Sequence, residues 1–195
     1  MISHLWTALG GSAMLLTRLA LAAALALGAL SAQAADPTAS LDRSFVEYTG
    51  NGPIGNNNLG SNNFYWMFES SGMYDGHAVN SWFLIWEPVR ARVTGSVTFD
   101  APILYMFDDQ AEMIATAGFG KPGVTYDYSH PSMGLDTVDK TTTSFTGSKL
   151  TLAWNASDPG DHVRILTAVP EPQTYALMLA GLGLTAWFAR RRRAD

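Results

Sequence analysis

The sequence predicts an all-β fold, a β-sandwich resembling a jelly roll over residues 35–168, with one apolar segment on each side of it. Two observations predict this fold class. Apolar and polar side chains alternate along several short stretches, as in strands that bury one face. Turn signals rich in Gly, Pro and Asp separate these stretches about every 8 to 12 residues, a spacing typical of antiparallel sandwiches. A domain of about 135 residues is large enough for one hydrophobic core and too small for two.

The expected strands follow from these patterns in chain order. Residues 93–99 and 150–154 alternate between apolar and polar positions, so each should present one face to the core. Residues 82–86 (WFLIW) and 103–107 (ILYMF) are continuous apolar runs that are short enough to be fully buried strands. Residues 109–116 could supply one or two turns of helix, and no other part of the domain has a helical period. Three further strands are expected at residues 64–69, 124–128 and 162–168.

Two segments rich in glycine are expected to be loops. Residues 50–63 (GNGPIGNNNLGSNN) have too few apolar side chains to pack, so we expect a mobile polar loop there. Residues 118–123 satisfy the G-x-G-x-x-G pattern of dinucleotide-binding proteins, but that motif requires a helix directly after it. Pro122 and the Val-Thr-Tyr sequence that follows favour a strand instead, so the pattern predicts a turn.

The apolar segment before the domain has the organisation of a secretory signal peptide, which we assign to residues 1–34. Residues 19–30 (LALAAALALGAL) are uninterrupted by charge and follow Arg18. Met14 would begin a more usual leader than Met1, and the sequence leaves both starts open. The segment ends in the small residues of a cleavage site, which include Ala32 and Ala34. The cut is expected after Ala34 or after Ala35. The domain is therefore expected to be exported.

The apolar segment after the domain is expected to cross a membrane once. Residues 174–189 carry no charge, and as a helix these roughly 16 residues would measure about 24 Å. This length is slightly below the ~30 Å of the hydrocarbon core, so the flanks must help the segment to span it. The basic cluster that follows should stay in the cytoplasm, which leaves the domain outside. This cluster consists of Arg190, Arg191, Arg192 and Arg193.

A short proline motif separates the domain from this helix. Pro170 and Pro172 each fix one φ angle and keep the preceding residue out of the helical region. Glu171 is therefore held in an extended and exposed backbone close to the membrane, where a membrane-embedded processing enzyme could bind it.

Residues 169–195 resemble the PEP-CTERM protein-sorting signal of Gram-negative bacteria, because the Val-Pro-Glu-Pro motif, the apolar helix and the arginine tail occur in that family's order. The resemblance implies that an exosortase, an inner-membrane cysteine transpeptidase, recognises and cuts the signal before the protein reaches the cell surface or the extracellular space. It leaves the cleaved bond open. The family context also implies an association with exopolysaccharide or biofilm material. The implied partners are thus the exosortase, transiently the membrane, and exopolysaccharide.

The domain itself has a looser similarity, over VTGSVTFDAPIL, GKPGVTYDY and SKLTLAWNASDPGDHVRILTAV, to an ectodomain type common among PEP-CTERM proteins. This similarity implies an extracellular β domain without an established activity.

The region between the apolar segments is acidic. The chain carries a net charge of −5, but five of its 12 Lys and Arg residues and one of its 17 Asp and Glu residues belong to the flanking segments, which leaves about −9. An acidic surface repels nucleic acid, so no nucleic-acid partner is expected. The chain has no cysteine, which excludes disulfides, thiol nucleophiles and zinc–thiolate sites.

Two groups of side chains are candidates for binding a ligand. Asp108, Asp109 and Glu112 cluster after an expected strand, where oxygen-rich loops can hold calcium, although the spacing is not that of a calcium loop. Trp66 and Tyr74 flank a Ser-Ser-Gly sequence, and we expect both rings to be exposed and able to stack on a sugar.

Catalytic patterns are missing from the sequence. His77, His130 and His162 lie far apart, and neither H-E-x-x-H nor G-x-S-x-G occurs. We therefore expect a non-enzymatic protein without a metal or cofactor. Two alternatives remain: a carbohydrate- or calcium-binding module, and a secreted hydrolase whose catalytic groups meet only in the folded chain.

Overall fold

The computed structural model describes residues 34–135, 141–156, 159–169, 181–183 and 185. The chain divides into two units, and Ala34–Pro170 is the one described below. Of the other unit, only the helical residues 181–183 and 185 are described. The expected signal peptide up to residue 33, the motif at 170–172, most of the expected helix at 174–189 and the arginine tail lie outside the described residues. Within the described residues, no helix combines the length and the apolar character that crossing a membrane requires.

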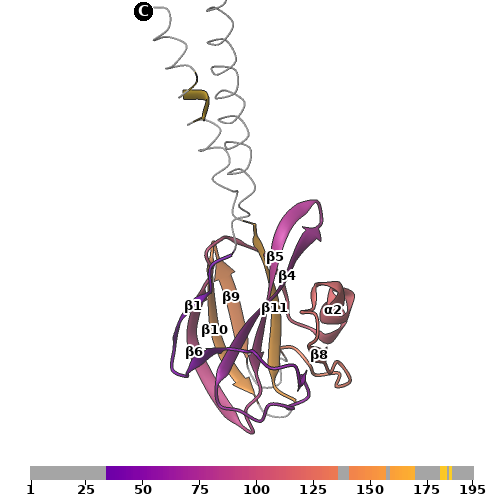
Figure 1. Cartoon of the computed structure of the whole chain (residues 1–195). Coiled ribbons are helices and arrows are strands. Elements are labelled where there is room, and N and C mark those ends of the chain that lie inside the picture. The colour runs from indigo at the N-terminus through magenta and orange to yellow at the C-terminus, as the bar shows by residue number, and fades with distance from the viewer. Residues whose placement is uncertain (1–33, 136–140, 157–158, 170–180, 184, 186–195) are drawn as a thin grey trace, which may run out of the picture. The chain divides into compact units, whose positions relative to one another are not determined.

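The fold is all-β, which confirms the predicted class. One sheet has four strands in the order β1-β6-β10-β9, the other has five in the order β2-β4-β5-β11-β7, and β3 and β8 form a separate pair (Figure 1). A short α-helix, α2 (Gln110–Ala115), and a 3₁₀ helix, η1 (Ala117–Phe119), follow β7. The strands are β1 (Thr38–Leu41), β2 (Phe45–Glu47), β3 (Pro53–Ile54), β4 (Phe64–Tyr74), β5 (His77–Trp86), β6 (Ala91–Thr98), β7 (Ile103–Phe107), β8 (Thr125–Tyr126), β9 (Thr142–Thr146), β10 (Lys149–Ala156) and β11 (Asp161–Ala168).

The main hydrophobic core lies between the two large sheets, as in a β-sandwich. Alternate residues from the first part of β4 and the last part of β5 point into it, and β6 and β10 contribute their alternating apolar residues from the other side, because strand side chains alternate between faces. Three tryptophans, Trp82, Trp86 and Trp154, are almost fully buried there. The core residues are Phe64, Trp66, Trp82, Leu84, Trp86, Val93, Val97, Phe99, Ile103, Leu150, Leu152, Trp154, Ala156, Val163 and Ile165.

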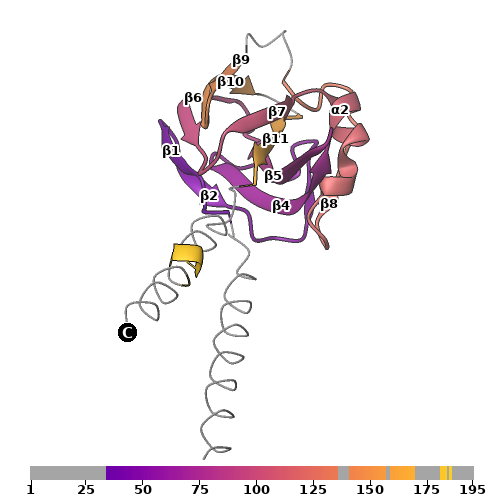
Figure 2. The same cartoon turned by 90° about the horizontal axis from the view of Figure 1, so that it is seen from above.

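A second layer covers the outer face of the five-stranded sheet. Figure 2 shows α2 and β8 beside β4 and β5, on the side away from β1 and β6. Phe83 and Ile85 of β5 pack there against Met113 of α2 and against Ile54 of β3, and all four are fully buried. Because β5 is covered on both faces, its run at residues 82–86 needs no polar position.

Two hairpins connect strands within a single sheet. The hairpin β4–β5 stays within the five-stranded sheet, and the hairpin β9–β10 stays within the four-stranded one. Other connections, such as those from β5 to β6, from β6 to β7 and from β10 to β11, pass from one sheet to the other. The jelly-roll connectivity stays a prediction.

The expectation that residues 50–63 do not pack is wrong, because the structure anchors this segment. Ile54 is fully buried, and the backbone N–H groups of Gly55 and Leu59 donate hydrogen bonds to the carboxylate of Glu87. The N–H of Asn57 donates to the carbonyl of Pro159 at 2.8 Å. Buried polar partners elsewhere in the chain therefore hold a segment that has few apolar side chains of its own.

Candidate functional site

The domain ends immediately before the proline motif. β11 is a central strand that pairs with both β5 and β7. Its last residue, Ala168, donates its backbone N–H to the carbonyl of Pro102 at 2.9 Å, and Val169 donates to the carbonyl of Ala78 at 3.1 Å. The backbone is thus held by the sheet up to the first residue of the Val-Pro-Glu-Pro sequence. Pro170, Glu171 and Pro172 lie outside the described residues.

The beginning of the domain is held by the loop that contains Pro102. The backbone N–H of Ala35 donates to Oδ2 of Asp100 at 2.7 Å, and Ala34 packs against the main core. Asp100 and Pro102 both belong to the connection between β6 and β7. Ala35 and Ala168, which are described residues near the two expected processing sites in the sequence, therefore both bind one short loop.

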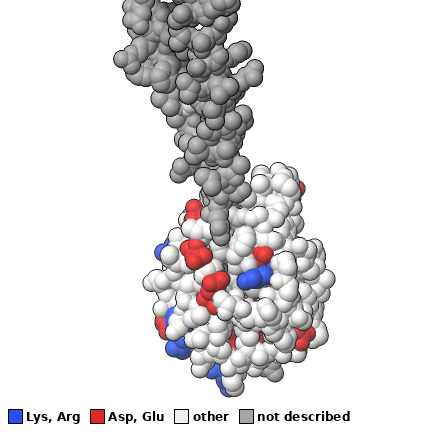
Figure 3. Space-filling model, viewed as in Figure 1, with Lys and Arg blue, Asp and Glu red and all other residues white. Residues whose placement is uncertain are grey.

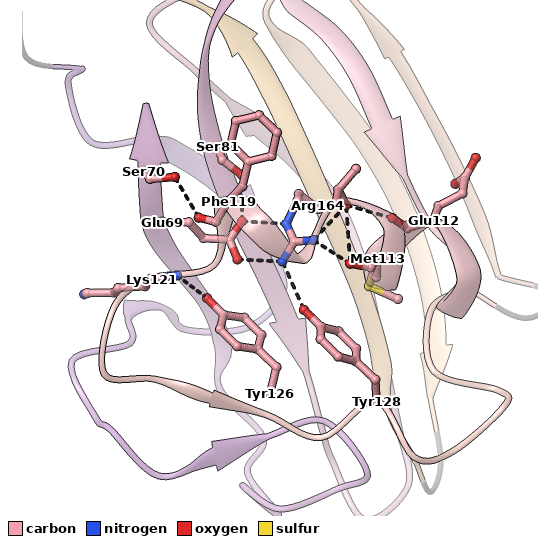
Figure 4. A network of polar contacts seen from close by, with 11 residues as sticks. Glu69, Ser70, Ser81, Glu112, Met113, Phe119, Lys121, Tyr126, Tyr128 and Arg164 are labelled. Carbon is pink, nitrogen blue, oxygen red and sulfur yellow. Dashed lines mark hydrogen bonds and ion pairs between the residues drawn. The ribbon is translucent and has the colours of Figure 1, made fainter. Parts of the chain in front are cut away.

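A buried ion pair connects the five-stranded sheet to the outer layer (Figure 4). Nε of Arg164 donates to Oε2 of Glu69 at 2.7 Å and Nη2 donates to Oε1 at 2.9 Å, with both side chains fully buried. Nη1 donates to the carbonyl of Met113 at 2.9 Å and to Oγ1 of Thr116 at 2.8 Å, and Nη2 also donates to the hydroxyl of Tyr128 at 3.1 Å. These contacts use all five N–H donors of the guanidinium. Arg164 therefore joins α2 and the Tyr128 segment to the sheet.

Burial and charge shift the titration of this cluster in opposite directions. Burial acts to lower the pKa of the Arg164 guanidinium, but the hydrogen bonds and charge of Glu69 outweigh it and leave that pKa raised. Burial also raises the pKa of Tyr126 and of Tyr128, so both phenols stay neutral at ordinary pH. Each group is committed to packing or to a protein hydrogen bond, which is the behaviour of a structural network.

A second buried pair anchors the segment 50–63. Nε2 of His162 lies 2.7 Å from Oε1 of Glu87, and both side chains are fully buried. Glu87 also accepts the hydrogen bonds of Gly55 and Leu59, and the imidazole stacks on Phe83 with ring centroids 6.0 Å apart. Sequence reasoning missed both buried pairs. The available signal was a His, an Arg and a Thr within the buried strand at 162–168, since buried polar groups need partners.

The candidate carboxylates have a local structural role. Oδ1 of Asp109 accepts the N–H of Glu112 at 2.8 Å and caps α2, and Oε2 of Glu112 accepts the N–H of Asp108 at 3.2 Å. Burial, followed by the charge of Asp109, raises the pKa of Asp108. Among the described residues, no three His, Cys, Asp or Glu side chains are grouped as a metal site would require.

The two candidate aromatics differ in exposure. Trp66 is only 6% exposed and stacks on Phe45 in the main core, so the expectation of an exposed ring is wrong for this residue. Tyr74 is partly exposed, near the end of the β4–β5 hairpin, and packs edge-on against Tyr105 at 4.8 Å. It also lines a cavity of about 320 Å³ that is formed with Ser70, Ser71, Gly72, Met73, Ala115, Thr116, Gly118 and Phe119.

The remaining sequence motifs have ordinary structural explanations. The G-x-G-x-x-G stretch contains the end of η1 and a turn in which Val124 donates to the carbonyl of Lys121 at 3.2 Å, as predicted. His130 accepts the N–H of Ser132 through Nδ1 at 3.2 Å. His162 is fully buried in its pair with Glu87.

Comparison with protein families identifies the sorting region directly. The family model for the PEP-CTERM protein-sorting motif matches residues 168–193. Comparison with curated proteins and with solved structures gave no match. The match begins at the last residue of β11, where the folded domain ends. The chain therefore carries a PEP-CTERM sorting signal, which marks it as an exported protein whose sorting depends on an exosortase.

Proposed function

We propose that this chain is a non-enzymatic protein of the cell surface or extracellular matrix, whose acidic β domain is the part delivered and which associates with exopolysaccharide or biofilm material. The observation that carries the proposal is the position of the sorting match. It begins at Ala168, and the sheet holds the backbone as far as Val169. The signal is thus attached to the domain without a spacer, so a cut within the motif frees the whole domain and little else.

The charge distribution sets the expected orientation of the sorting signal in the membrane. Arg190–Arg193 should keep the end of the precursor in the cytoplasm, so that residues 174–189 span the inner membrane once and the domain lies outside. The proline motif would then lie near the outer surface of the inner membrane, within reach of an exosortase. Removal of the helix would convert an anchored domain into a released one.

A role without catalysis is supported by how the domain uses its polar groups. The Arg164–Glu69 and His162–Glu87 pairs are fully buried and hold loops and a helix in place. On the face in Figure 3, basic side chains are few and scattered, which gives an anionic polymer no concentrated binding patch. Association with exopolysaccharide through this face would therefore depend on hydroxyl and aromatic contacts rather than on charge.

Mass spectrometry of the released protein tests the sorting step. The full chain is produced in a host with the matching exosortase, beside a variant with Pro170, Glu171 and Pro172 replaced by Ala, and a matched control with Glu47→Gln on an exposed strand. We expect wild type and control to be released without Arg190–Arg193 and the triple variant to remain in the membrane. Released wild-type protein that still ends in the intact arginine tail would refute the proposal.

A carbohydrate-binding module is the second candidate, because Tyr74 lines the cavity at the end of the β4–β5 hairpin. Serine hydroxyls and aromatic rings are the groups that proteins use against sugars. Isothermal titration of the released protein with purified exopolysaccharide, and separately with Ca²⁺, tests this candidate. Binding heat with the polymer that is lost in Tyr74→Ala but kept in Tyr65→Phe would support this candidate. The absence of binding heat with both the polymer and Ca²⁺ would refute it.

A further inference from the structure

The beginning of the domain carries a contact whose meaning depends on where the signal peptide is cut. The nitrogen of Ala35 lies 2.7 Å from Oδ2 of Asp100, a residue 65 positions away. Both residues are exposed. In the precursor this nitrogen is an uncharged amide, which gives the Asp100 carboxylate one hydrogen bond.

The two cuts left open by the sequence have different consequences for this contact. Hydrolysis of the bond between Ala34 and Ala35 converts the Ala35 nitrogen into an α-ammonium with three donors and a positive charge. It would then lie at the carboxylate that it already contacts, which is the strong, charge-assisted form of the bond. Hydrolysis after Ala35 would remove that nitrogen and begin the protein at Asp36, adding a carboxylate next to the new ammonium. Both cuts remove Ala34 and its contact with the core, so only the Asp100 contact distinguishes them.

We infer that signal peptidase cuts between Ala34 and Ala35 and that the freed α-ammonium of Ala35 forms a salt bridge with Asp100. This inference rests on the export described under the proposed function. The salt bridge anchors the chain three residues before β1, which begins at Thr38. β1 lies at the edge of its sheet and pairs only with β6 among the described strands, so it benefits from a fixed start.

Two other charged residues lie close to this contact in the sequence or in the sheet register. Asp36, the next residue, adds a second negative charge close to the same amine. Lys149 at the start of β10 is the nearby cation, since its register partner is Thr98, two residues before Asp100. Replacement of Asp100 should therefore remove the negative charge that is hydrogen-bonded to the amine. The carboxylate of Asp36 would remain and would interact with the amine more weakly.

The first test is the N-terminal sequence and intact mass of the released protein. We expect it to begin with Ala35-Asp36-Pro37. A released protein that begins at Asp36 would overturn this inference and leave the export intact. Absence of any released protein would overturn the export and this inference with it.

The second test measures the ammonium itself. The α-amine of the released protein is ¹³C-methylated and titrated by NMR in the wild type, in Asp100→Asn and in the control Glu47→Gln, an exposed carboxylate on β2. An unpaired α-amine titrates at about 7.7 to 8.0. We expect a higher pKa in the wild type and the control, and a return toward the unpaired value in Asp100→Asn, which keeps the shape of the side chain. Equal values in all three proteins would refute the salt bridge.

Discussion

Replacement of Glu69 by Ala should strongly destabilise the domain, because it leaves the Arg164 charge buried without its partner. Nε and Nη2 of Arg164 each lose a charge-assisted hydrogen bond, of 2.7 and 2.9 Å. At about 1.5–3 kcal/mol for each such bond, the expected cost is about 3–6 kcal/mol. Breaking a buried pair by removing one partner typically costs about 3–5 kcal/mol, which agrees with this figure. Ser81 also loses its acceptor, since its hydroxyl donates to Glu69 at 2.6 Å.

Urea unfolding of the released protein, followed by tryptophan fluorescence, measures this cost. The double variant Glu69→Ala with Arg164→Met removes both charges, so it should recover part of the lost free energy of unfolding. The control Glu47→Gln lies on an exposed strand and should unfold like the wild type. A Glu69→Ala protein within about 1 kcal/mol of the wild type, or a double variant no more stable than Glu69→Ala, would refute the view that the buried charge dominates.

Three further predictions concern other parts of the fold. Glu87→Ala should expose the amide of Gly55 to hydrogen exchange while the main core stays protected, and equal protection in both proteins would contradict the anchoring role. Gly95→Ala should cost about 1–3 kcal/mol in urea unfolding, because Gly95 has φ 141° and a Cβ there would collide with the carbonyl oxygen of Ser40. Burial raises the pKa of Tyr126 above its ordinary value of 10.0, so the folded state favours the neutral phenol and stability should fall as the pH rises above about 10. Tyr126→Phe should weaken that fall, and an unchanged pH profile would show that the ring titrates normally.

The strands predicted from sequence were those whose side chains meet the core. The apolar run at 82–86 and the alternation at 150–154 lie within β5 and β10, because burial imposes these patterns directly. β1 and β9 were missed because most of their residues are exposed, so their place is set by pairing with β6 and β10 rather than by an apolar pattern. Local sequence contains little of that information.

The errors about Trp66 and about residues 50–63 have two different origins. Trp66 shares strand parity with Phe64, so its burial could have been predicted from the alternation, whereas its neighbour sequence Ser-Ser-Gly suggested exposure. The anchoring of residues 50–63 depends on Glu87, about 30 positions further along the chain and beyond any local pattern. The sorting signal is the opposite case. Its information lies in composition and order over residues 168–193, so the sequence alone was sufficient to recognise it.

The β6–β7 loop has a consequence for how the domain is presented to its surroundings. Since Ala35 and Ala168 are both tied to this loop, an attachment through either end of the chain holds the domain by the same side. β11 begins at Asp161 and ends on that side at Ala168, eight residues or about 26 Å later, and Asp161 pairs with Trp86, close to the turn that contains Val89, which is 75% exposed. The Val89 turn thus lies at the end of the sandwich that is remote from both chain ends of the domain.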